Sequence, residues 1–196
     1  MTGRVDWAAF IQKIYEAFDK KVNELLYSAV MSAGDKLPAP AQFVKTGALD
    51  TTTKDTFFTL VEDVQMATGE EVVIMGTRSA LSKLTGMGDV DWISNEMKQE
   101  RYTTGKLGYF EGVRLVEIPQ VFADNDTSKK LVDSTKLLIM PTGDNRFVKM
   151  YDEGEAQFTE ITDSATHQDM TIDAEYQRKM GVAVVINKRF GVWNIA

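Results

Sequence analysis

Apolar residues recur at alternating steps of three and four between residues 6 and 30. Because an α-helix repeats every 3.6 residues, this spacing places them in one stripe along a long amphipathic helix. Asp6 is a candidate N-cap, and Gly34 a candidate C-terminal stop. At a rise of 1.5 Å per residue the helix is roughly 38 Å long, so we expect it to lie across an extended partner. The stripe contains Trp7, Phe10, Ile11, Ile14, Phe18, Val22, Leu25 and Leu26.

Helical patterns around one short buried strand follow. Threonine caps at 51–53, an apolar stripe from Phe57 to Val64 and the glycine at Gly69 predict a helix with clear ends. The apolar run EEVVIMG has the length of a buried strand. In chain order we expect a loop at 37–50, a helix at 51–69, a strand at 70–76, and helices at 77–88 and 90–100.

The pattern changes to strands and turns after Tyr102. Short apolar or alternating runs bounded by proline and glycine are typical of antiparallel strands. The expected elements are an extended segment at 108–119, a strand at 134–143, a long hairpin at 146–161 with its tip at Asp152–Gly154, and the last strands within 170–195. Helices in the first half and antiparallel strands in the second predict an α+β fold.

Composition limits the classes of function that this chain can have. Twenty-nine acidic residues against 22 basic ones give a formal charge of −7, which disfavours a surface that neutralises many phosphates. The absence of cysteine excludes disulfides and thiolate chemistry. No apolar run approaches the roughly 20 residues of a membrane span, and no signal peptide is recognisable. We therefore expect a soluble protein made in the cytoplasm, with no membrane partner.

Candidate catalytic and metal-binding residues are few. His167, the single histidine, lies in a polar stretch without a partner that the sequence can identify. Carboxylates cluster at Asp89 and Asp91, at Asp124 and Asp126, and at Asp152, Glu153 and Glu155. These lack the glycine and distant glutamate of an EF-hand, and turn chemistry accounts for them. We predict no catalytic residue, no cofactor and no metal, and hence no enzyme.

The segment Val72–Leu84 is the strongest candidate for a binding site. Strand, turn and helix in this order can present backbone amides to a phosphate. Only Gly76 lies in the turn, whereas dinucleotide and P-loop fingerprints need more glycines or a terminal GK[ST]. An ordinary turn capped by Thr77 is the simpler interpretation, and a nucleotide- or phosphate-binding enzyme stays as an alternative.

The order of elements resembles the major capsid protein of tailed bacteriophages, a fold shared with encapsulin shells. Four segments carry the resemblance, at 3–30, 53–87, 105–122 and 150–195. Segment 3–30 is similar to the family's long spine helix, and segment 53–87 to the helix, strand and helix of its axial domain. Segment 105–122 is similar to the following strand that ends at proline, and segment 150–195 to the closing long strands. The resemblance implies peripheral-like parts at 1–34 and 144–196 and an axial-like part at 35–143.

What the resemblance implies is assembly in place of catalysis. Copies of the chain would form hexamers and pentamers of an icosahedral phage head or prophage-derived shell, enclosing double-stranded DNA without sequence-specific binding. Scaffolding and portal proteins are possible partners, and the virion is the expected location. The helix begins so early that we expect neither the family's N-terminal arm nor its extended loop, and so a monomer or small oligomer. A different virion or adaptor component is a further alternative.

Overall fold

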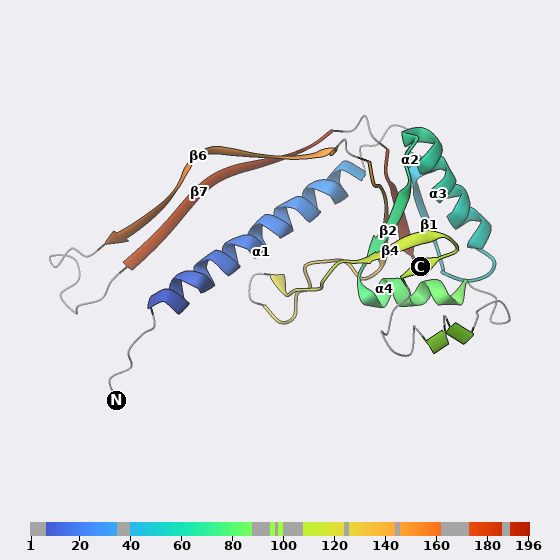
Figure 1. The fold of residues 1–196 in the computed structure, drawn as a ribbon, viewed down its shortest axis with the longest axis horizontal. Helices are drawn as coiled ribbons and strands as arrows, with labels where there is room; N and C mark the ends of the chain where they lie inside the picture. Colours follow the sequence, from blue (N-terminus) through green and yellow to red (C-terminus); the bar gives the residue numbers. More distant parts are fainter. Residues whose placement is uncertain are drawn as a thin grey trace. The chain divides into compact units, whose positions relative to one another are not determined.

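The computed structural model divides the chain into two compact units, coloured along the sequence in Figure 1. Unit 1 contains Met1–Ala29 and Val148–Val184, and unit 2 contains Val30–Phe147 and Val185–Ala196. Residues 185–196 thus belong to the same unit as the middle of the chain, and the division into peripheral-like and axial-like parts stays a prediction. The structure describes residues 7–34, 40–87, 95–96, 98–99, 108–123, 126–143, 146–161, 173–185 and 189–196.

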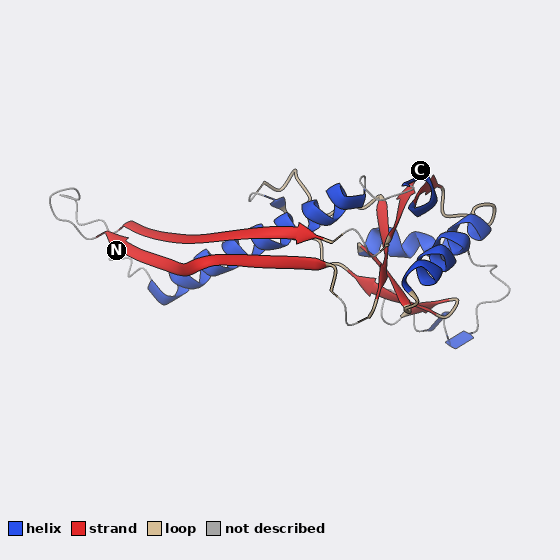
Figure 2. Cartoon of the chain, turned by 90° about the horizontal axis from the view of Figure 1, so that it is seen from above, coloured by secondary structure: helices blue, strands red, loops and turns tan. Residues whose placement is uncertain are grey.

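Unit 1 consists of one helix and one two-stranded ribbon. Helix α1 spans Trp7–Gly34, and its residues up to Ala29 belong to this unit. Strands β6 (Val148–Ile161) and β7 (Asp173–Val184) pair antiparallel to form the ribbon. Figures 1 and 2 show α1 running along the ribbon. The long helix therefore has the extended partner that its length requires.

The hairpin predicted within residues 146–161 is wrong, because this segment is a single strand of 14 residues. Its residues pair with β7 on both sides of Gly154, and the register shifts between Glu153 and Gln157. Gly154 has a positive φ of 80°, so the turn-like sequence forms a bulge in place of a turn. Asp152 and Glu153 form ion pairs with Arg178 and Lys179, respectively. Arg178 and Lys179 of β7 thus place opposite charges beside this acidic segment.

Unit 2 is built on a mixed sheet of six strands. The sheet has the order β1-β8-β5-β2-β4-β3, with β1–β8 and β2–β4 parallel and the other neighbours antiparallel. Short helices and one longer helix connect and cover the strands, so the α+β prediction is confirmed. The strands are β1 (Val44–Gly47), β2 (Val72–Gly76), β3 (Tyr109–Phe110), β4 (Val113–Glu117), β5 (Lys136–Pro141) and β8 (Gly191–Ile195), and the helices are α2 (Pro40–Phe43), α3 (Lys54–Thr68), α4 (Arg78–Lys83) and the 3-10 turn η1 (Leu84–Gly86).

The core of unit 2 lies between α3 and the sheet. The predicted stripe of α3 is buried, and the Phe57 ring meets the Trp193 ring edge to face at 5.2 Å between centroids. Gly191 lets α3 lie close to β8, since a Cβ at this position would lie 3.2 Å from a methyl of Val64. Gly69 ends the helix in the left-handed conformation, as predicted. The fully buried side chains of this layer include Phe57, Leu60, Val64, Ile74, Leu137, Ile139 and Trp193.

Two other predicted segments differ from the structure. The extended segment at 108–119 is a tight hairpin of β3 and β4, because Glu111 and Gly112 both adopt positive φ angles of 45° and 83°. The predicted loop 37–50 contains α2 and β1. Of the helix expected at 90–100, only residues 95–96 and 98–99 are described, and these are helical. The proposed cap at Asp6 lies outside the described residues.

Candidate functional site

The stripe of α1 is only partly covered by the ribbon. Tyr176 of β7 meets Tyr15 and Phe18 of α1 in T-shaped ring contacts, with centroids 5.3 and 5.0 Å apart. Phe10 and Leu25 each remain 41% exposed. The side chain of Trp7 lies outside the described residues. The other stripe residues, Ile11, Ile14, Phe18, Val22 and Leu26, are half-buried.

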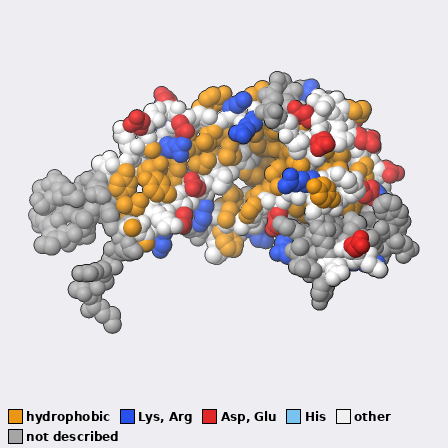
Figure 3. Space-filling model, viewed as in Figure 1, with side chains coloured by type: hydrophobic (Ala, Val, Ile, Leu, Met, Phe, Trp, Pro, Cys, Tyr) orange, Lys and Arg blue, Asp and Glu red, His pale blue; other side chains and the backbone are white. Residues whose placement is uncertain are grey.

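No side chain of unit 1 is fully buried among its described residues. On the ribbon Tyr151 is 59% exposed and lies opposite Gly181, where no atom would meet an added Cβ within 4 Å. Figure 3 shows hydrophobic side chains open to solvent over this part of the chain. Exposed apolar residues on this scale are typical of interaction surfaces.

The turn between β2 and α4 is held by a side-chain cap. The Thr77 hydroxyl oxygen accepts a hydrogen bond from the Ala80 amide at 3.3 Å, which is the cap that the sequence predicted. Gly76 is required here, because a Cβ would lie 2.6 Å from a methyl of Leu137. Helix α4 has only six residues, so it offers a short dipole and few free amides to an anion.

A hollow of about 460 Å³ opens beside this turn. The loop after β4 forms its other wall, and Gln120 fixes that loop. The Gln120 amide nitrogen donates to the Val132 carbonyl at 2.6 Å, and its oxygen accepts from the Val132 amide at 2.9 Å. The lining residues are Thr77, Arg78, Ser79, Ser82, Gln120, Lys130 and Ser134. Two cations and several hydroxyls therefore line the hollow, and the described part of its lining contains no carboxylate.

Two carboxylates near this wall in the sequence, Asp126 and Asp133, are engaged within their own turns. Hydrogen bonds from the Ser128 hydroxyl and amide lower the pKa of Asp126. Burial raises the pKa of Asp133, but the hydrogen bonds from Thr135 and the charge of Lys136 have a larger combined effect. The pKa of Asp133 is therefore lowered. Both carboxylates thus remain charged and bound within their own turns.

The remaining carboxylate candidates show no ligand geometry. Among the residues described here, no group of three or more His, Cys, Asp or Glu side chains could hold a metal ion. Arg178 binds Asp152 through two hydrogen bonds, at 2.9 Å from Nε and 2.7 Å from Nη2, and Lys179 pairs with Glu153 at 2.6 Å. His167, Asp89, Asp91 and Asp124 lie outside the described residues. Within the part of the chain searched, no helix combines the length and apolar character that a membrane span requires.

Comparison with solved structures places this arrangement in a known class. The chain is similar over its whole length to "Capsid structure of the Cyanophage P-SCSP1u", with a TM-score of 0.68 and 11% identity, and it covers 68% of that chain. It is likewise similar over 100% of its length to "Asymmetric unit of bacteriophage PhiM1 mature capsid", with a TM-score of 0.59 and 12% identity, covering 66% of that chain. The chain thus spans about two thirds of the length of each. The fold is that of bacteriophage capsid proteins.

The sequence identifies the family within this class. A family model described as "SPbeta prophage-derived putative capsid protein YonB" matches residues 1–194, and the chain belongs to that family. No curated protein matches the sequence. The expected resemblance to phage capsid proteins is confirmed, and the protein has a structural capsid role. Sequence reasoning missed the hollow beside Thr77, because Lys130 and Ser134 reach it only through the fold.

Proposed function

We propose that this chain is the major shell-forming subunit of a phage head or prophage-derived particle. Copies self-assemble through hexamers and pentamers into a closed icosahedral shell, and the protein performs no catalysis. The observation that carries the proposal is the incomplete burial of unit 1. No described side chain of that unit is fully buried, so neighbouring copies would supply the missing contacts.

Shell formation of this kind needs only modest individual contacts. Identical copies that meet through different surfaces close into rings, and rings close into shells. Several such contacts act at once, so their combined strength greatly exceeds that of each one. The exposed apolar residues of α1 and the ribbon, with Tyr151, Tyr15 and Met150 as the most exposed, form the surfaces that we assign to this role.

The shell encloses double-stranded DNA in this proposal without binding its sequence. A formal charge of −7 opposes extensive neutralisation of phosphates. The DNA would therefore be confined by the closed shell. Scaffolding and portal proteins are the additional partners that such a particle implies, with synthesis in the host cytoplasm and the virion as the final location.

Negative-stain electron microscopy of the protein, expressed from its complete natural reading frame, tests the proposal. We expect closed particles of uniform diameter. A protein that stays monomeric at every concentration and salt condition would contradict it. A thermal-shift screen with inorganic phosphate and nucleotides tests the alternative at Val72–Leu84, and we expect no saturable stabilisation.

A further inference from the structure

The hollow beside Thr77 presents two cations without ion-pair partners. Among the described residues, neither Arg78 nor Lys130 takes part in an ion pair, and both side chains are exposed. The nearby acids pair with other lysines, Asp126 with Lys129 and Asp133 with Lys136, each at 3.9 Å. The described residues that line the hollow are all polar or charged, and the carbon atoms of these side chains form much of its wall. The hollow therefore fits a negatively charged surface that also presents a side chain able to lie against this carbon.

Helix α3 carries such a surface on its outer face. Asp55, Thr59, Glu62 and Met66 follow one another at steps of four, three and four residues, and all four are exposed. This spacing places them in one stripe on the side opposite the buried stripe. Met66 is 75% exposed, the largest exposed fraction among the large hydrophobic residues described. Figure 3 shows acidic side chains over α3.

The acidic residues on this helix also have no cationic partners. Asp55, Glu62 and Asp63 form no ion pair with any described residue. Lys54, at the start of α3, is engaged by Glu111. The outer face of α3 therefore has an unbalanced negative charge around a protruding methionine, which complements the hollow in both charge and polarity.

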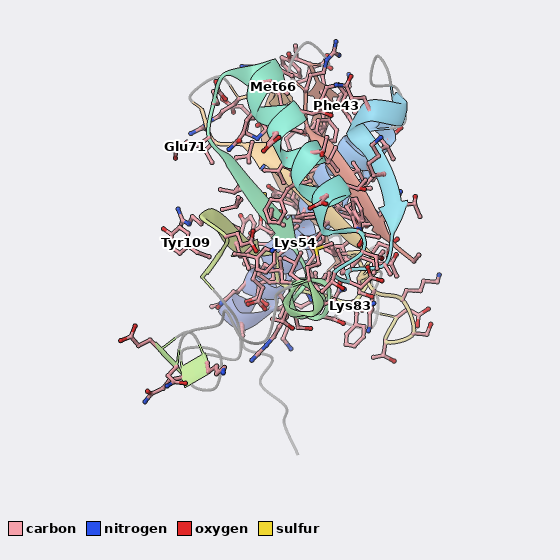
Figure 4. The ribbon with its side chains drawn as sticks, turned by 90° about the vertical axis from the view of Figure 1, so that its right-hand side faces the viewer. Phe43, Lys54, Met66, Glu71, Lys83 and Tyr109 are labelled. Carbon is pink, nitrogen blue, oxygen red and sulfur yellow. The ribbon has the colours of Figure 1, made fainter. Side chains whose placement is uncertain are left out.

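One copy cannot bring its own two surfaces together. Figure 4 shows Met66 near the top of unit 2 and Lys83, the last residue of α4, well below it. The α3 stripe is fixed in place by the buried residues on its inner side, Phe57 and Val64 among them. The complementary surfaces can thus meet only between two copies.

We infer that the hollow receives the α3 stripe of a second copy of this chain. In this contact Met66 enters the hollow, and Glu62 and Asp63 face Arg78 and Lys130. The two surfaces differ, so the contact is heterologous and repeats from copy to copy around a ring. The inference rests on the proposed self-assembly and assigns one of its contacts to unit 2.

Cysteine cross-linking tests the contact directly, because the natural sequence contains no cysteine. The experiment mixes two full-length variants of different mass, Thr59→Cys on the α3 stripe and Ser82→Cys in the hollow, under mild oxidation. We expect the mixed disulfide to exceed either homodimer about tenfold, because thiols held in contact react at a high effective concentration. In the matched control, Ser28→Cys, at an exposed position on α1, replaces one of the two cysteine variants in the mixture. Mixed and homodimeric products in random proportions would overturn the inference.

A charge exchange provides the second test. Arg78→Glu with Lys130→Glu, introduced into the Ser82→Cys chain, should lower the cross-link yield about tenfold, since like charges then face each other. Glu62→Lys with Asp63→Lys in the Thr59→Cys chain should have the same effect, and combining the two altered chains should restore the yield. Circular dichroism verifies that each variant is folded. If restoration fails while each variant is folded, the contact is not formed by these charges.

The outcome separates this inference from the proposed function. Particles that form in electron microscopy with no specific cross-link would leave the shell proposal intact and overturn this contact. A specific cross-link without particles would support the contact and contradict the closed shell. A cross-link that inorganic phosphate abolishes at constant ionic strength would show that the hollow binds anions in general, and would overturn its specificity for α3.

Discussion

The indole nitrogen of Trp193 donates a hydrogen bond to the carbonyl oxygen of Gly47 at 3.1 Å. Their strands, β8 and β1, are parallel neighbours, and the register places Gly47 opposite Ile195. Trp193 is almost completely buried. A segment near the beginning of the chain is thus fixed to its last strand through one aromatic side chain, and Gly47 provides the space for that ring.

Gly47→Ala should destabilise unit 2. A Cβ at this position would lie 2.9 Å from Cζ2 of Trp193, and the buried ring has little room to move. We expect a loss of about 1–3 kcal/mol in the free energy of unfolding, the usual effect of an extra methyl in a packed core. Urea unfolding monitored by tryptophan fluorescence measures it. Gly181→Ala, where the space is open, is the control, and equal effects at both positions would contradict the packing argument.

Tyr176→Ala should weaken the contact between α1 and the ribbon. The substitution removes two T-shaped ring contacts, with Tyr15 and Phe18, which together stabilise by about 1–3 kcal/mol. Hydrogen-deuterium exchange should become faster in residues 8–29 and stay unchanged in α3. Tyr151→Ala on the open face of the ribbon removes a similar ring and should leave exchange in α1 of the monomer unchanged. The same acceleration in both variants would contradict the assignment.

Arg178→Lys should loosen the ribbon beside its bulge. The arginine donates two hydrogen bonds to Asp152, and its guanidinium lies 5.9 Å from the centre of the Phe18 ring. The hydrogen bonds to Asp152 raise the pKa of Arg178. Lysine keeps the charge but cannot form the two-point contact.

Amide exchange at residues 152–157 measures this effect, and we expect it to increase in Arg178→Lys. Lys179→Ala removes the neighbouring ion pair, whose two side chains are 74% and 75% exposed, and it should have little effect because exposed pairs contribute little. A larger change from Lys179→Ala than from Arg178→Lys would refute the role of the two-point contact.

Asp50→Asn should lower the melting temperature at neutral pH but not in acid. Hydrogen bonds from Thr52 and Thr53 lower the pKa of Asp50 below its ordinary value of 3.8, so the folded state favours the charged carboxylate. That stabilisation is fully present above the unfolded-state pKa and is lost as the pH falls through the folded-state value.

Thermal melts of Asp50→Asn and the unaltered chain should therefore converge below pH 3.8. Asp19→Asn, a substitution on the exposed face of α1, is the control for the loss of a carboxylate outside this turn. A melting difference for Asp50→Asn that is constant from neutral pH to acid would show that its charge does not stabilise the turn before α3.

The sequence predicts elements whose signals are local. Helix α3 was recognised from its threonines, its apolar stripe and Gly69, all of which act within a few residues. Strand β1 was missed because its four residues form a strand only by pairing with β8 at the far end of the chain. The Asp152–Gly154 segment has the composition of a turn, but the cross-strand pairing of Asp152 and Glu153 with β7 decides its structure.

The same contrast between local and long-range signals applies to the candidate site. The cap at Thr77 was visible in the sequence, because an N-cap acts on an amide three residues away. The position of Lys130 beside Arg78 was not visible, since it depends on the loop that Gln120 holds through Val132. The capsid class was predicted because the order of long elements survives where individual residues do not.

The position of β8 between β1 and β5 in the sheet has a consequence for synthesis on the ribosome. Strand β8 is translated after every other strand of the sheet, and among the described strands β1 pairs with β8 alone. A nascent chain therefore holds β1 unpaired, and its sheet cannot close until residues 191–195 have left the exit tunnel. Any subunit surface that depends on the closed sheet therefore appears only after this segment has emerged from the ribosome.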